Sequence, residues 1–258
     1  MDLHSPGGNL RAFLKARTSL DGSDSVTWFA GTVHAWIPGG VQPPLLGFEG
    51  YNVSRVVEAD GGYDLLTREA VFYLDPQSHE ILEAWTNPFT DEQVNVVHVW
   101  NDPVNQRLRT DGPRPFRAGV TESGPLVVFN ADIFLAYPSP LPRAEFPESS
   151  QDDLYQAAEL FQFYCERAEL EDDAPSAPCL VSWARIAPWL PFMRMADRPG
   201  RLVYHGRGRK LPGGYAELPG RIRSYVETHG PQYASAPTEF TEPNETSWTY
   251  FRKLAAKT

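Results

Sequence analysis

The chain has 258 residues, of which 41% are hydrophobic and 12% aromatic, and its formal net charge is −10. This composition is typical of a folded globular protein and excludes a disordered chain. Nucleic-acid-binding proteins need a basic surface to displace counterions, so the acidic balance argues against that class. No apolar run approaches the roughly 18 residues that span a bilayer, and we expect no transmembrane segment.

The N-terminus and the cysteines bear on the cellular compartment. No basic start followed by an apolar core is present, so the sequence predicts no signal peptide. The two cysteines, Cys165 and Cys179, are too few for a zinc ribbon or an iron–sulfur cluster. We therefore expect reduced, buried thiols in a cytoplasmic protein.

The first half of the chain reads as short extended segments separated by turn motifs such as Asp60-Gly-Gly and Asn87-Pro. No intervening stretch is long enough for a crossover helix, which argues against parallel strands. The pattern predicts a mainly β fold, an antiparallel meander that closes as a lipocalin-like barrel or, alternatively, folds as a sandwich. The expected strands are Val26–Trp36, Leu45–Glu58, Tyr63–Leu74, Ile81–Thr86, Val94–Trp100, Arg107–Thr110 and Leu126–Tyr137.

Beyond a proline-rich link the pattern changes. Apolar residues from Leu154 to Ala168 recur at intervals of three and four, which predicts an amphipathic helix near 151–169. Further helices are expected near 215–228 and 246–256. The sequence thus predicts one domain over 1–258, with two or three helices flanking the barrel. Two more strands are expected at Cys179–Ile186 and Leu202–Lys210.

Several predicted strands have one apolar face and one face that mixes aromatic with polar residues, since side chains alternate along a strand. The mixed face carries Trp28, His34 and Trp36 in the first strand, and Glu69 and Tyr73 in the third. Such a face is typical of a ligand cavity, so we expect it to point inward. The alternative is the reverse, with the apolar face in a filled core.

Three residues are candidates for catalysis. His98 lies on a predicted strand, where a histidine held by a carboxylate can act as a general base, and Asp102 follows just beyond. Arg185 lies between Trp183 and Trp189 and can present a guanidinium fork to a carboxylate or enolate. Each residue also has a structural alternative: His98 can be a hydrogen-bonded core residue, Asp102 can form an Asx turn, and Arg185 can belong to an ion pair.

The residues expected to bind substrate are mostly aromatic. No close histidine spacing indicates a metal site, and we expect neither a metal nor a cofactor. The predicted substrate-binding residues are His34, Trp36, Glu49, Tyr73, Trp85, Trp100, Trp183, Trp189 and Lys210.

Four motifs are distributed over nearly the whole chain: Trp85-Thr-Asn-Pro, Val97-His-Val-Trp-Asn-Asp-Pro-Val-Asn105, Val181–Met193 and Asn244-Glu-Thr-Ser-Trp-Thr-Tyr-Phe251. Together they resemble the uncharacterised bacterial and fungal domain-of-unknown-function family one-eight-three-eight. The resemblance implies no activity and assigns no residue a role.

These features predict a cofactor-independent acid–base enzyme of secondary metabolism: an isomerase, cyclase, lyase or hydratase. Its substrate would be a small, largely apolar aromatic, polyketide or terpenoid metabolite. His98 would be the base, and Arg185 or a tyrosine would stabilise charge. A lipocalin-like carrier is the alternative, and it needs no titratable pair in its cavity. A third reading, an interaction domain, would expose the mixed face as a patch. A homodimer is compatible with the sequence.

Overall fold

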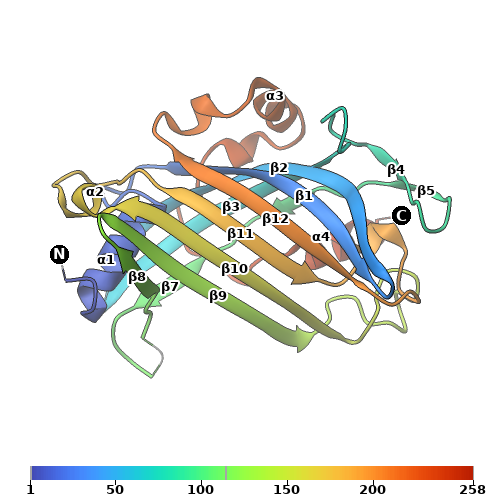
Figure 1. The fold of residues 1–258 in the computed structure, drawn as a ribbon, viewed down its shortest axis with the longest axis horizontal. Coiled ribbons are helices and arrows are strands. Elements are labelled where there is room, and N and C mark those ends of the chain that lie inside the picture. The colour runs from blue at the N-terminus through green and yellow to red at the C-terminus, as the bar shows by residue number, and fades with distance from the viewer. Residues whose placement is uncertain (1, 114, 258) are drawn as a thin grey trace.

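A large antiparallel sheet dominates the computed structural model, which describes residues 2–113 and 115–257 and omits the side chains of Val41 and Gln42 (Figure 1). The predicted mainly β, antiparallel class is confirmed. In chain order the elements are α1 (Pro6–Arg17), β1 (Ser25–Ile37), β2 (Gly40–Ala59), β3 (Gly62–Leu74), β4 (Ala84–Thr86), β5 (Gln93–Asn95), β6 (Val99–Asn101), β7 (Gln106–Arg109), β8 (Gly119–Ser123), β9 (Leu126–Pro138), β10 (Leu154–Glu166), α2 (Arg167–Glu171), β11 (Leu180–Ala187), η1 (Pro191–Met193), β12 (Arg201–Leu211), η2 (Gly214–Glu217), α3 (Gly220–His229), η3 (Pro231–Ala234) and α4 (Ser247–Ala255).

The large sheet is open. Its strands lie in the order β6-β3-β2-β1-β12-β11-β10-β9-β8, with β7 also paired to β3. Among the described residues no ladder joins β6 to β8, so the predicted closure into a barrel is wrong. The two end strands have only 3 and 5 residues, and β8 accompanies β9 no further than Asn130. Beyond Asn130 the edge of β9 has no strand partner among the described residues, whereas the edge of β3 is paired with β7 and β6 over much of its length.

Residues 154–166 form a strand, and the helix predicted near 151–169 is wrong. β10 pairs with β9 from Leu154 to Glu166 and with β11 from Ala158 to Tyr164. Tyr155, Phe163 and Cys165 are buried and share one face, which is the period of two that a strand requires. Pairing on both sides of β10 overrides the local helical spacing. Helices do lie at both later positions, as α3 and α4.

The two ends of the curled sheet are filled differently. At the end where β1 begins, Phe13 of α1 packs edge-on against Phe129 and Phe163, at ring-centroid distances of 5.9 and 5.4 Å. At the other end, Trp85 and Trp189 belong to a buried cluster that includes residues of η1. Between these two plugs the inner face is free to line a cavity.

Helix α3 covers the outer face of β1–β3 (Figure 1). Ile222 and Val226 of α3 are fully buried in a cluster with residues of these strands. Glu49 of β2 anchors the helix, because its carboxylate is ion-paired with Arg221 and accepts a hydrogen bond from Trp28 Nε1 at 2.7 Å.

The C-terminal segment crosses the open side of the sheet. On the β6 side, Asn244 and Asn105 exchange hydrogen bonds of 2.8 and 2.9 Å. On the β10 side, the ring of Trp248 packs against Tyr155 at 4.9 Å. The segment therefore lies where a barrel would have closed. None of the described helices is long and apolar enough to cross a membrane.

Candidate active site

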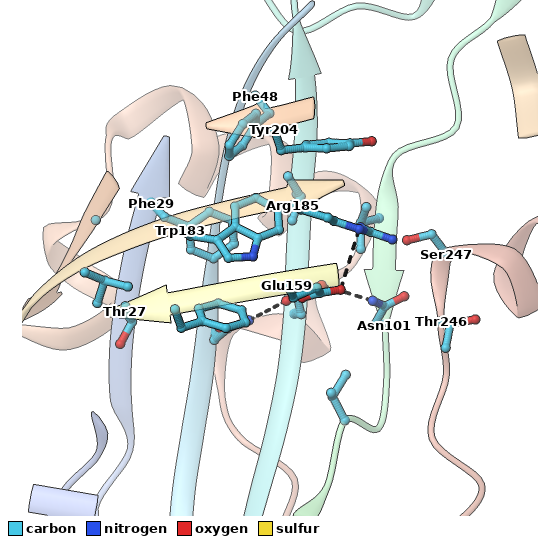
Figure 2. Close-up of a pocket in the computed structure, with 18 of the residues that line it drawn as sticks. Thr27, Phe29, Phe48, Asn101, Glu159, Trp183, Arg185, Tyr204, Thr246 and Ser247 are labelled. Carbon is cyan, nitrogen blue, oxygen red and sulfur yellow. Dashed lines mark hydrogen bonds and ion pairs between the residues drawn. The ribbon is translucent and has the colours of Figure 1, made fainter. Parts of the chain in front are cut away.

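A cavity of about 210 Å³ lies between the inner face of the sheet and the C-terminal segment (Figure 2). A cavity of about 150 Å³ accommodates benzene, so this one has room for a ligand of one or two rings. Its aromatic walls come from six strands and contain Phe29, Phe48, Tyr73, Tyr155, Phe161, Phe163, Trp183 and Tyr204.

Two glycines make room for the rings at the centre of this wall. Gly31 of β1 pairs with Phe48 on one side and Gly206 on the other, and Gly206 pairs with Trp183. The rings of Phe48 and Trp183 meet edge to face above them, 5.5 Å apart. A Cβ on Gly206 would lie 3.0 Å from Phe48 and 3.1 Å from Trp183. The aromatic wall therefore depends on small residues beneath it.

Glu69 of β3 is a carboxyl group held in the cavity by two amides. Asn52 donates to Oε2 at 2.9 Å, and Asn101 donates to Oε1 at 3.0 Å. Burial raises the pKa of Glu69, and the nearby charge of Glu159 adds to the rise; the two amides and Arg185 oppose it without cancelling it. Glu69 therefore keeps its proton to a higher pH than an exposed glutamate does.

Arg185 lies at the end of the cavity nearest the C-terminal segment (Figure 2). Its Nη2 donates to the hydroxyl of Tyr155 at 2.6 Å, and its Nε lies 3.5 Å from Glu159 Oε1. The guanidinium also stands 5.4 Å from the ring centroid of Tyr204 and 5.8 Å from that of Trp248. Burial raises the pKa of Tyr204 to about 12, so its hydroxyl stays protonated near neutral pH. This end of the cavity thus combines a fixed cation with a carboxylate and hydroxyls.

Four polar atoms of the lining have neither a hydrogen-bond partner nor an ion pair in the described part of the chain. They are Arg17 Nε, Asn101 Oδ1, Trp183 Nε1 and the Tyr204 hydroxyl. Most buried polar groups in folded proteins are hydrogen-bonded. Three donors and one acceptor are therefore left unpaired around the cavity.

The inward face differs from the expected one in several strands. Phe29 of β1 and Val99 of β6 line the cavity, whereas the mixed-face residues Trp28, His98 and Trp100 lie on the other side of the sheet. The predicted mixed face points inward in β3, through Glu69, Val71 and Tyr73. The outer aromatic residues are explained by α3, which buries that side of β1–β3.

Three of the predicted site residues line the cavity: Tyr73, Trp183 and Arg185. The other substrate-binding predictions lie elsewhere. Trp36 is 56% exposed, and Lys210 donates to the backbone carbonyls of Lys15 and Thr18 near the end of α1. Glu49 and Trp100 lie on the outer face of the sheet, and Trp85 and Trp189 lie in the plug opposite α1. His34 contacts the hydroxyl of Thr32 at 3.0 Å.

His98 and Asp102 are not brought together. His98 Nδ1 accepts a hydrogen bond from the Tyr73 backbone at 3.1 Å, and its ring packs against Phe72. Asp102 is ion-paired with Arg68 at 2.8 Å. Both residues therefore fit structural roles, and the structure gives no support to His98 as the base acting in the cavity.

The environment of His98 predicts an acid-sensitive fold. Burial lowers the pKa of His98 from 6.5 to about 4. Because the folded state disfavours its protonation, the stability that His98 contributes is full above pH 6.5 and is lost as the pH falls toward 4. We expect about 2 kcal/mol of this loss between pH 7 and pH 5, measured by urea unfolding.

Two variants test this prediction: one replaces the buried His98, and the control replaces an exposed histidine. In His98→Gln, which keeps an acceptor, the difference in unfolding free energy between the two pH values should shrink by the same amount. His205 is exposed, and His205→Gln should leave it as in the wild type. An unchanged pH dependence in His98→Gln would show that another group causes the acid sensitivity.

Glu159 and Arg17 are two charged cavity residues for which the sequence predicted no role. Glu159 falls in the segment predicted to be helical, and Arg17 ends α1, which is far from β11 in sequence. Only the alternation Tyr155, Ala157, Glu159 could have placed Glu159 on an inner strand face. Nothing in the sequence around Arg17 indicates a cavity.

Comparison with known proteins gives a family and no activity. A family model described as "Protein of unknown function (DUF1838)" matches residues 22–255, which include every strand of the sheet. The resemblance carried by the four motifs is confirmed. A search of curated proteins finds no match.

Proposed function

Since the chain belongs to the DUF1838 family, which is described as having no known function, we propose its function from the site itself. The protein is a cofactor-independent acid–base enzyme that acts on a small, largely apolar metabolite of one or two rings. The reaction class is isomerisation, cyclisation, elimination or hydration, in which protons move without a change of oxidation state.

The observation that supports this proposal is the carboxyl of Glu69. It is enclosed by aromatic walls, held by Asn52 and Asn101, and has a raised pKa. A carboxylic acid that keeps its proton toward neutral pH can donate it to a bound substrate. A carrier needs no such group, which favours an enzyme over a lipocalin-like binder.

The second carboxyl group gives the acid a partner. Glu159 shares the cavity with Glu69 and is paired with Arg185, a permanent cation. Two carboxyl groups in different environments are a common arrangement for acid and base roles. In the proposed step Glu69 protonates one substrate atom and Glu159 accepts a proton from another, so that a double bond shifts or a leaving group departs.

Arg185 and the tyrosines stabilise the charge that develops. The Arg185 guanidinium and the Tyr155 hydroxyl are joined at 2.6 Å, and the free Tyr204 hydroxyl lies on the same side. Donors fixed in a site of low polarity stabilise a developing enolate more than water does. This role for Arg185, or for a tyrosine, is the one that the sequence suggests.

The test begins with the ligand. Protein purified from its own host is analysed by native mass spectrometry, and a denatured extract identifies what is bound. The compound is then incubated with fresh wild-type enzyme, with chromatographic separation because an isomer has the same mass. Conversion supports the proposal. Recovery of the compound unchanged, with stoichiometric binding, would identify a carrier instead.

A further inference from the structure

Arg17 places a positive charge at the α1 end of the cavity. Its guanidinium stands 5.9 Å from the ring centroid of Phe163, and its Nε has no hydrogen-bond partner in the described part of the chain. Arg185 lies at the other end, against Trp248 of the C-terminal segment. The cavity therefore has two cationic ends, with aromatic walls between them.

The carboxylates of the lining leave Arg17 without a close counter-ion. Glu159 is paired with Arg185, and Glu245 lies 2.6 Å from Lys253. Both oxygens of Glu69 accept hydrogen bonds from amides. Within the described residues no carboxylate lies within the 4.0 Å of an ion pair to Arg17. A buried charge without a partner destabilises a fold considerably, so its retention needs an explanation.

Trp183 adds a donor that is also free. Its Nε1 has no partner among the described residues, and its ring is stacked with that of Phe161, 6.0 Å away. Successive inward residues of β11, Val181, Trp183 and Arg185, all line the cavity and run from one end toward the other. A planar ligand lying along this wall would pass Trp183 between the two arginines.

We propose that the substrate is a monocarboxylic acid with one or two rings, whose carboxylate is bound by Arg17 and hydrogen-bonded by Trp183 Nε1. A guanidinium fork matches a carboxylate geometrically, and a bound carboxylate would be the close counter-ion that Arg17 lacks among the described residues. The apolar walls enclose the rings, and the far part of the ligand reaches Glu69 and Arg185. This substrate class rests on the proposed function, because it gives a role to a further charged residue of the same cavity.

The experiment uses a matched pair of probes with the full chain. Isothermal titration calorimetry at pH 7.5 compares 2-naphthoate with 2-naphthalenemethanol, which has the same rings and no charge. We expect the wild type to bind the acid about tenfold or more tightly than the alcohol. Arg17→Gln should remove that preference. Arg11→Gln, a charge change at an exposed residue of the same helix, should retain it.

A second variant keeps the test decisive if Arg17→Gln does not fold. Trp183→Phe retains the ring and removes the N–H, so binding of the acid should weaken severalfold while binding of the alcohol does not. Equal affinity for the two probes in the wild type, no binding of the acid at millimolar concentration, or a preference that survives in a folded Arg17→Gln would overturn the proposal.

Failure of this inference differs from failure of the proposed function. Glu69→Gln should still prefer the acid, because Arg17 and Trp183 are intact. If the probes are distinguished but Glu69→Gln converts the natural ligand at the wild-type rate, the carboxylate site stands and the acid–base role of Glu69 fails. If the probes are not distinguished but Glu69→Gln is inactive, the acid–base role of Glu69 stands and the carboxylate site fails.

Discussion

Glu69→Gln is expected to lower turnover of the natural substrate by about 10²–10⁴-fold, the usual contribution of a positioned acid or base. Glutamine has nearly the same shape and its one carbonyl oxygen can accept from one of the two amides, but it cannot release a proton. Substrate affinity should change little. Single-turnover kinetics on the ligand captured from the host separates the chemical step from binding.

The dependence of the rate on pH shows whether Glu69 acts as an acid. If Glu69 acts as the acid, the wild-type rate is highest while its carboxyl is protonated and falls as the pH rises through its raised pKa. Glu58→Gln removes an exposed carboxylate of β2 and should leave both rate and profile unchanged. A Glu69→Gln enzyme within about threefold of wild type would exclude Glu69 from the chemistry.

Gly31→Ala is expected to destabilise the fold by about 3 kcal/mol, at the upper end of what overpacking does. A Cβ at this position would lie 2.1 Å from the carbonyl oxygen of His205 and 2.7 Å from Cζ of Phe48. The first contact is with the backbone of a neighbouring strand, so a side-chain rotation cannot relieve it. Urea unfolding should show a lower midpoint, and the wall formed by Phe48 should shift.

Gly119→Ala is the matched control, since Gly119 is also a strand glycine. A Cβ there would lie 3.5 Å from Cβ of Asn130, an ordinary contact, and β8 lies at the edge of the sheet. Its unfolding free energy should change by less than about 0.5 kcal/mol. Equal effects at both positions would mean that the loss of glycine flexibility, rather than close packing under the aromatic wall, determines stability.

The sequence predicted the local elements better than the way they join. Turn motifs delimit β1, β2, β3 and β9 clearly, because glycine and proline restrict where a strand can continue. Closure of the sheet depends on the lengths of β6 and β8 and on the C-terminal segment between them. These are long-range properties that local patterns do not contain.

The helix predicted in place of β10 and the inward face predicted for β1 are wrong for related physical reasons. In β10 the inward position of Glu159 interrupts the apolar alternation, so the helical spacing of the neighbouring apolar residues appears stronger. In β1 the outer residue Trp28 appears suited to a cavity because α3, some 190 positions later, buries that face. A polar group inside and an aromatic group outside both reverse the usual signal.

The candidate site was predictable only in part. Trp183, Arg185 and Tyr73 were predicted to belong to it because aromatic and guanidinium groups on strands point to ligand binding. Glu69 was placed on the inward face of its strand but given no role, since its two amides come from β2 and β6. The arrangement that raises its pKa exists only after the sheet curls.

A titration of Glu69 without any substrate tests directly whether this carboxyl keeps its proton toward neutral pH. Infrared difference spectra of wild type minus Glu69→Gln, recorded from pH 3 to 9, isolate the carboxyl stretch of this one group. We expect a protonated-carboxyl band that persists after the exposed glutamates have ionised, and that disappears only at higher pH. A band lost together with those of the exposed glutamates would contradict this expectation, because Glu69 would then be an ordinary carboxylate with no proton to donate.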